Sequence, residues 1–178
     1  AQKFTTSLSK VYRYVLEQKD KELVSVTEEL TFAKTYMNLL LMRFENSITF
    51  EIPDTIENDE AKVVPLSLQL LLENCIKHNL ATSSKPLLIR IFTEGDTLCI
   101  ENNLQIREQI KESAGIGLTN IVQRYSLLTK KNVFIEKSED YFKVKLPILS
   151  AKPNVVTEKT SNEDPAYERA QKRVKELK

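Results

Sequence analysis

Apolar and polar positions along the first 148 residues switch between helical and strand spacing. Stretches with apolar residues three or four apart predict helices, and stretches of strict alternation predict strands. In order along the chain, this pattern predicts helices at about 1–20 and 25–44, a strand at 48–52, a helix opened by Pro65, strands near 87–93 and 97–102, a helix from about 117 to 129, and strands near 133–136 and 141–146. From 150 onward the chain is polar, which predicts a flexible tail with a short terminal helix capped by Asp164-Pro165.

Two local signals fix boundaries in this pattern. Ser25 followed three residues later by Glu28 fits a capping box at the start of the second helix, and Thr27 is the competing N-cap. Glu94-Gly95-Asp96 is a good hairpin turn between the two central strands. The order of elements predicts an α+β fold in which helices pack on one face of a mainly antiparallel sheet.

Composition narrows the class of protein. The chain has 178 residues, of which 41% are hydrophobic and 29% charged, as expected for a soluble globular domain with some additional chain. A net charge of +1 gives no reason to expect a nucleic acid or an anionic membrane as partner. No apolar run reaches transmembrane length, and Cys75 and Cys99 lack zinc or disulfide spacing, which indicates reduced cytoplasmic thiols. Because the chain starts with Ala1, we expect it to be part of a larger protein.

The most informative segment is the polar end of the third helix. Asn74, Lys77 and His78 fall at positions i, i+3 and i+4 and so share one helix face, with Glu73 at its edge. Asn and Glu oxygens suit Mg²⁺, whereas Lys and His suit phosphate, so the segment points to a nucleotide site. Alternatively, Lys77 and His78 satisfy the helix carbonyls and dipole, and Glu73 is a solvated charge.

A second cluster is Ser113-Ala114-Gly115-Ile116-Gly117-Leu118-Thr119-Asn120, which holds two of the three glycines in the chain. Glycines ahead of a helix let phosphate oxygens approach backbone N–H groups at its N-terminus. A tight entry into the helix without any ligand is the alternative.

These residues resemble a known family. The run from Val64-Pro65 through Glu73-Asn74 to His78 resembles the N box of a sensor histidine kinase of the LytS type. Gly115 through Arg124 resembles its second glycine box and the following helix. The stretches 8–16 and 28–44 are similar to the segments that precede the ATP domain, so the resemblance covers about residues 1–148.

The resemblance implies the Bergerat ATP-binding fold of the GHKL superfamily: a two-layer α/β sandwich with a mixed sheet, helices on one face and an N-terminal helical segment. It implies three regions: a partial dimerisation helix at 1–22, the ATP-binding domain at 23–149, and a polar linker or tail at 150–178.

The resemblance also assigns roles. Asn74 would hold Mg²⁺, Glu73 would orient a water or assist proton transfer, and Lys77 and His78 would face the phosphates of ATP. The nucleotide-binding positions would be Asn102, Asn103, Gly115, Ile116, Gly117, Leu118 and Asn120. Within the lid at 104–114, Arg107 or Lys111 would fold onto the phosphates or remain solvated; Arg124 would contact a phosphate or a domain interface, or form a surface salt bridge.

Three departures from the family pattern qualify the assignment. Asn102 stands where the family has an Asp that recognises adenine, without a following glycine, so we expect weaker adenine binding. Asn79 replaces the usual glycine after the histidine, and we expect it to form a left-handed cap. Finally, His78 is the single histidine, so the phosphoacceptor histidine is expected upstream and this chain alone cannot autophosphorylate.

The leading interpretation is the catalytic ATP-binding domain of a two-component sensor histidine kinase. Implied partners are ATP with Mg²⁺, a response regulator and, through the N-terminal helix, a second copy of the chain; no nucleic acid is expected. The domain would be cytoplasmic, with membrane anchoring only through upstream regions. The alternatives are a degenerate, non-catalytic signalling module and a stand-alone GHKL-type ATPase.

Overall fold

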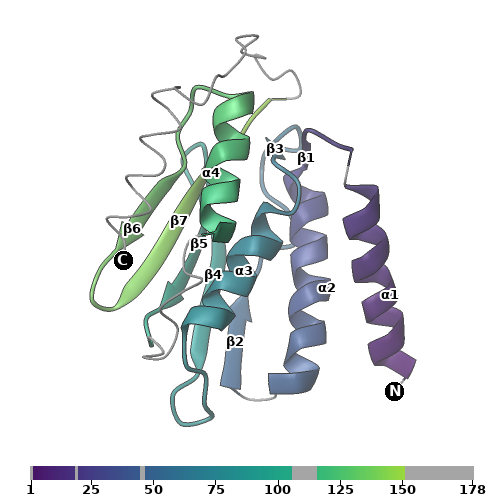
Figure 1. Cartoon of the computed structure of the whole chain (residues 1–178), viewed down its shortest axis with the longest axis vertical. Coiled ribbons are helices and arrows are strands. Elements are labelled where there is room, and N and C mark those ends of the chain that lie inside the picture. The colour runs from purple at the N-terminus through teal and green to yellow at the C-terminus, as the bar shows by residue number, and fades with distance from the viewer. Residues whose placement is uncertain (1, 19, 45–46, 106–115, 151–178) are drawn as a thin grey trace.

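The computed structural model describes residues 2–18, 20–44, 47–105 and 116–150 (Figure 1). Its elements are α1 (Gln2–Glu17), β1 (Val24–Ser25), α2 (Val26–Phe44), β2 (Ile48–Glu51), β3 (Lys62–Val63), α3 (Ser67–His78), β4 (Leu87–Glu94), β5 (Thr97–Asn103), α4 (Ile116–Leu128), β6 (Phe134–Lys137) and β7 (Tyr141–Pro147). Most of the predicted lid, Gly115 and the predicted tail lie outside the described residues.

Five strands form one sheet in the order β2-β4-β5-β7-β6. β2 runs parallel to β4, because β3 and α3 carry the chain across between them, and the remaining pairs are antiparallel. Figure 1 shows α2, α3 and α4 on one face of this sheet and α1 on the outer side of α2. The predicted two-layer α+β fold with a mixed sheet and an N-terminal helix is therefore confirmed.

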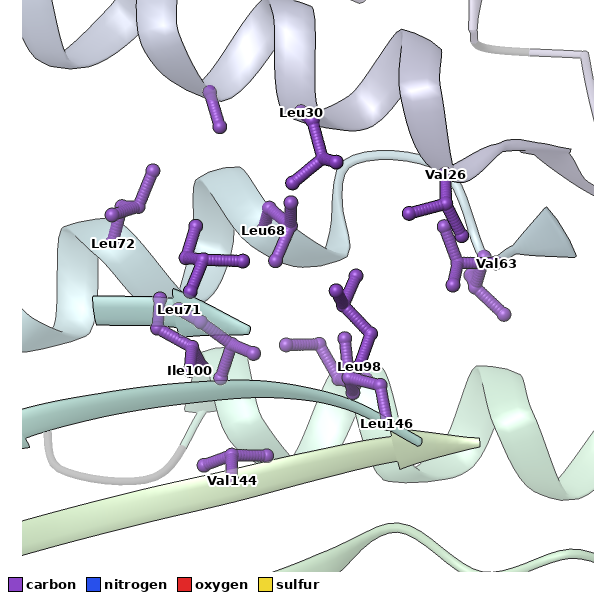
Figure 2. Packing of buried hydrophobic residues seen from close by; sticks show 14 of the residues in the cluster. Val26, Leu30, Val63, Leu68, Leu71, Leu72, Leu98, Ile100, Val144 and Leu146 are labelled. Atoms are coloured by element: carbon purple, nitrogen blue, oxygen red, sulfur yellow. The ribbon is translucent and has the colours of Figure 1, made fainter. Parts of the chain in front are cut away.

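The core fills the space between the helices and the sheet. Side chains of α3, including Leu68, Leu71 and Leu72, pack with the inward residues of the central strands and with α2 (Figure 2). The strands alternate as their pattern predicted: in β4, Leu87, Ile89 and Ile91 are buried, whereas the residues between them face outward.

The outer face of the sheet is charged instead of apolar. Its side chains form a line of ion pairs across all five strands of this sheet, linking Glu51, Arg90, Glu101, Lys143, Glu136, Lys145 and Glu94. The sheet therefore has a single buried face, and the helical layer carries the candidate site.

The start of α2 has the predicted capping box. Ser25 Oγ accepts a hydrogen bond from Glu28 N at 3.1 Å, and Glu28 Oε2 accepts one from Ser25 N at 3.0 Å. Ser25, and not Thr27, is thus the cap. The neighbouring two-stranded pair β1–β3, which joins Val24 to Val63, was not predicted.

The start of α3 differs from the prediction. Pro65 does not lie in the first turn; the helix begins at Ser67, after Leu66 adopts a left-handed conformation with φ of 63°. The side chain of Leu66 forms no cap. Instead Glu29 of α2, which is fully buried, accepts hydrogen bonds from Leu66 N at 2.8 Å and Leu68 N at 3.2 Å.

The same carboxylate contacts α1. Tyr14 OH donates a hydrogen bond of 2.9 Å to Glu29 Oε1, and the Tyr14 ring stacks on Phe32 of α2 with centroids 4.2 Å apart. Val11 is buried in this contact, with Leu8 partly buried beside it. The apolar side chains at helical spacing in α1 therefore pack in part on α2 of their own chain, while Phe4 and Tyr12 remain exposed.

Candidate functional site

The two predicted motifs meet where α3 lies beside the N-terminus of α4. A Cβ placed on Gly117 would lie 3.5 Å from both Oδ1 and Nδ2 of Asn74. The absent side chain of Gly117 therefore leaves space directly against the amide of Asn74. An Asn oxygen is a suitable ligand for Mg²⁺, and the N–H groups at the start of a helix attract phosphate.

Glu73 lies one residue before Asn74 and is partly buried. Its Oε1 accepts two hydrogen bonds, one from Gln69 Nε2 at 2.9 Å and one from Tyr36 OH of α2 at 3.3 Å. Glu73 is therefore an anchored carboxylate and not the freely solvated charge of the alternative interpretation. Sequence reasoning missed both partners; Gln69 was detectable as the i−4 neighbour of Glu73, whereas nothing local pointed to Tyr36.

Lys77 and His78 occupy the last turn of α3. Lys77 is exposed and His78 is half-buried. Burial lowers the pKa of His78, and the charge of Lys77 lowers it further, so the imidazole is neutral at pH 7 and Lys77 carries the positive charge. Within the described part of the chain, neither side chain donates a hydrogen bond to a helix carbonyl, although Lys77 in the last turn still complements the helix dipole.

Asn79 ends α3 in a way that the sequence did not predict. Its backbone is extended, with φ of −116° and ψ of 148°, and not left-handed. The buried side chain bridges two segments: Nδ2 donates to Cys75 O at 2.8 Å, and Oδ1 accepts from Gln105 N at 2.8 Å. The amide thus satisfies an orphan helix carbonyl and fixes the chain directly after β5.

Asn102 and Asn103 end β5 with different environments. Asn102 is buried, and its Nδ2 donates to Asn103 O at 2.7 Å, which leaves Oδ1 as the hydrogen-bond acceptor. In Asn103, Oδ1 accepts from Leu88 N at 2.8 Å and Nδ2 donates to Pro86 O at 3.2 Å. The side chain of Asn103 therefore holds the start of β4, whereas that of Asn102 keeps an oxygen suited to an exocyclic amine.

The remaining predicted positions lie in or near α4. Leu118 is buried in the core, so its side chain is structural, and Asn120 is exposed. Ile116 opens the helix, and Gly115 lies outside the described residues. Arg124 is partly buried and has no salt-bridge partner among the described residues; its Nη1 donates to Pro65 O at 2.7 Å, just before α3.

Together, a two-layer α+β fold, an Asn side chain facing a Gly on the next helix and an anchored Glu are the features expected of the ATP-binding region of a histidine kinase. Comparison with known proteins supports the same class. A family model described as "Histidine kinase" matches residues 1–48, which includes both α1 and α2. The chain is 32% identical over 133 residues, 70% of its length, to the sensor histidine kinase YesM of Bacillus subtilis. It is also 35% identical over 80 residues, 44% of its length, to the sensor protein LytS of Enterococcus faecalis.

The predicted resemblance to LytS-type sensor histidine kinases is therefore confirmed. The matched parts cover only 23% of YesM and 13% of LytS, so the chain spans less than a quarter of these relatives. A solved structure of the cytoplasmic segment of the histidine kinase QseC aligns with 74% of this chain and 81% of that one, at a TM-score of 0.49 and 13% identity. In the described residues, no helix is both long and apolar enough to cross a membrane.

Proposed function

We propose that this chain is the ATP-binding catalytic region of a two-component sensor histidine kinase. In the intact protein, the γ-phosphoryl group of ATP would pass to a histidine upstream of this chain and then to a response regulator. The observation that carries the proposal is the close approach of Gly117 to the Asn74 amide, where an added Cβ would lie 3.5 Å away, beside the anchored Glu73. The similarity to YesM and LytS supports the same reaction.

Each residue of the site has a role in this proposal. Asn74 Oδ1 would ligate Mg²⁺, and Glu73 would orient a water or accept the proton of the attacking histidine. Lys77 would attract the phosphates, and neutral His78 would donate or accept a hydrogen bond there. Bound Mg-ATP would supply the phosphoryl group and the metal charge that offsets its oxygens; the chain would contribute position and electrostatics.

Adenine recognition would use Asn102. Its Oδ1 would accept a hydrogen bond from the exocyclic amine, as the family's aspartate does, but without a full negative charge. The buried position of Asn102 at the end of the central strand β5 supports this role.

Titration calorimetry with a non-hydrolysable ATP analogue tests the proposal directly. We expect binding that needs Mg²⁺ and that Asn74→Ala abolishes. Asn38→Ala is the matched control, because Asn38 is exposed on α2 and should leave binding unchanged. Absence of binding at millimolar analogue would contradict the proposal and favour the second candidate, a degenerate signalling module, which the missing carboxylate at Asn102 motivates.

A stand-alone ATPase of the same fold is distinguishable by kinetics. It would hydrolyse ATP steadily without an acceptor histidine and would lose this activity in Glu73→Ala. A kinase region without its acceptor would instead bind Mg-ATP with little turnover, and labelling from ATP would appear only when the upstream histidine is present.

We further propose that a second copy of the chain covers the outer side of α1. Phe4, Tyr12 and Leu16 expose 44%, 64% and 69% of their surfaces there, although α1 is already packed on α2. The association of histidine kinases as homodimers suggests this occupant. Sedimentation of the intact kinase should show a dimer that Leu16→Glu weakens, whereas an unchanged dimer would place the interface elsewhere.

A further inference from the structure

We propose that Tyr36 and Gln69 are positioning residues for Glu73. Together they hold one oxygen of its carboxylate and leave the other available for proton transfer or for a metal-bound water. This inference rests on the proposed kinase function and extends it to two residues outside the motif, one of them on another helix.

The two oxygens of the Glu73 carboxylate have different hydrogen-bond environments. Both donors converge on Oε1, Gln69 Nε2 at 2.9 Å and Tyr36 OH at 3.3 Å. Among the residues that the structure describes, no donor reaches Oε2. A glutamate with one oxygen bonded from two directions keeps a defined orientation, and the second oxygen retains its acceptor capacity.

The two donors come from independent supports. Gln69 lies one helical turn before Glu73 on α3, so its reach follows from helix geometry. Tyr36 lies on α2, and its ring stacks on the buried Phe32 with centroids 6.1 Å apart and planes 22° apart. A rotation of α3 that carries Glu73 away from α2 would therefore lengthen the contact with Tyr36.

The surroundings of Tyr36 favour its protonated hydroxyl, which is the form that donates the hydrogen bond. Burial raises the pKa of the Tyr36 phenol, and the neighbouring Glu73 charge raises it further. The hydroxyl thus stays protonated at every pH at which the protein works, and its proton remains on the hydrogen bond to Glu73.

Preorganisation of this kind should affect the rate and not the binding of nucleotide. Productive catalysis needs the carboxylate fixed within a fraction of an ångström, whereas Mg-ATP affinity depends on Asn74, Lys77 and Asn102. Tyr36→Phe keeps the ring and its stacking but removes the hydroxyl. We expect it to lower the autophosphorylation rate at saturating Mg-ATP by about five- to ten-fold, with a less than roughly two-fold change in nucleotide affinity.

The experiment uses the intact kinase with its upstream histidine and combines kinetics with a double-mutant cycle. In a Glu73→Gln background, Tyr36→Phe should cause no further loss of rate, because its effect acts through the carboxylate. Gln69→Met, which keeps the side-chain length without the donor, should reproduce the loss of rate. Urea unfolding of the same four proteins of the cycle supplies a readout independent of activity. The change in the unfolding constant of the double variant should be smaller than the product of the changes in the two single variants.

Tyr14→Phe is the matched control. It removes the same hydroxyl from a hydrogen bond to a different carboxylate, Glu29, in the same row of stacked rings. It should lower stability. At saturating Mg-ATP the bound nucleotide would itself stabilise α3, so the rate should be unchanged. Loss of rate in Tyr14→Phe equal to that in Tyr36→Phe would overturn the inference, because both effects would then be structural.

Two further outcomes separate the inference from the function on which it rests. A wild-type rate in Tyr36→Phe, or an equal loss with and without Glu73, would overturn the inference while the kinase function stands. Failure of the wild-type protein to bind Mg-ATP would overturn the proposed function itself, and the positioning role with it.

Discussion

Gly117→Ala offers a test in which stability and ligand binding should move in opposite directions. Gly117 is the second residue of α4, and its φ is not in the left-handed region, so alanine can adopt its backbone conformation. The added Cβ would lie 3.5 Å from Oδ1 and Nδ2 of Asn74, which is ordinary van der Waals contact and not a clash.

The expected gain in stability follows from the unfolded chain. Replacing glycine by alanine at a compatible helical position stabilises by about 0.4–1 kcal/mol, because the unfolded state loses conformational freedom. For a chain of this size, such a gain raises the melting temperature by about 1–4 °C. Thermal and urea unfolding of the chain without ligand would measure it.

The same substitution should weaken ligand binding. The new methyl group fills the space against the Asn74 amide in which we place the metal-bound phosphate. We expect Mg-ATP affinity to fall by at least about ten-fold, equivalent to about 1.4 kcal/mol, in calorimetric titration. The pair of results distinguishes a blocked site from a damaged fold.

Gly95→Ala is the matched glycine control. Gly95 has φ of 58° and nothing within 4 Å of its added Cβ, so alanine would be strained but not crowded. It should destabilise by about 1–2 kcal/mol and leave affinity unchanged. Lower stability of Gly117→Ala, or full affinity for Mg-ATP in that variant, would refute the reasoning about the space beside Asn74.

Three other predictions concern single side chains. Because the pKa of His78 is lowered on folding, its contribution to stability is complete above the ordinary histidine pKa of 6.5 and is lost as the pH falls below that value; urea unfolding against pH should show this decline, and His78→Gln should remove it. Tyr14→Phe should cost about 1–3 kcal/mol of unfolding free energy, because the buried Glu29 loses a donor; a loss below 0.5 kcal/mol would mean that water replaces the hydroxyl. Asn102→Asp should destabilise by about 1–3 kcal/mol, although the family has Asp there, because the donation to the Asn103 carbonyl is lost; an equally stable variant would contradict that role.

Those parts of the fold that depend on local periodicity were predictable. The long helices and the sheet strands follow from repeating apolar positions, and the capping box at Ser25 follows from residues three apart. The hairpin turn at Gly95 was equally local. The pair β1–β3 was not predictable, because two-residue strands carry no periodic signal and their partners are distant in sequence.

The candidate site was predictable as a set of residues but not as an arrangement. Nothing around Pro65 indicated that Glu29, more than thirty residues earlier, would cap α3 in place of a local side chain. The extended backbone of Asn79 depends on its bridge to Gln105, which forms only in the folded chain. The role of Tyr36 was not predictable from the sequence for the same reason, because its contact with Glu73 joins two different helices.

The buried carboxyl group of Glu29 couples the packing of α1 on α2 to the conformation at the start of α3. Its oxygens accept one hydrogen bond from the Tyr14 hydroxyl of α1 and two from the backbone N–H groups of Leu66 and Leu68 at the start of α3. Lifting α1 away would remove the Tyr14 hydroxyl from the buried carboxyl group of Glu29. It would thereby disturb the group that caps the helix carrying Glu73 and Asn74. Because thermodynamic linkage is reciprocal, a ligand that stabilises the start of α3 would also stabilise the packing of α1 on α2, and by the same coupling free energy.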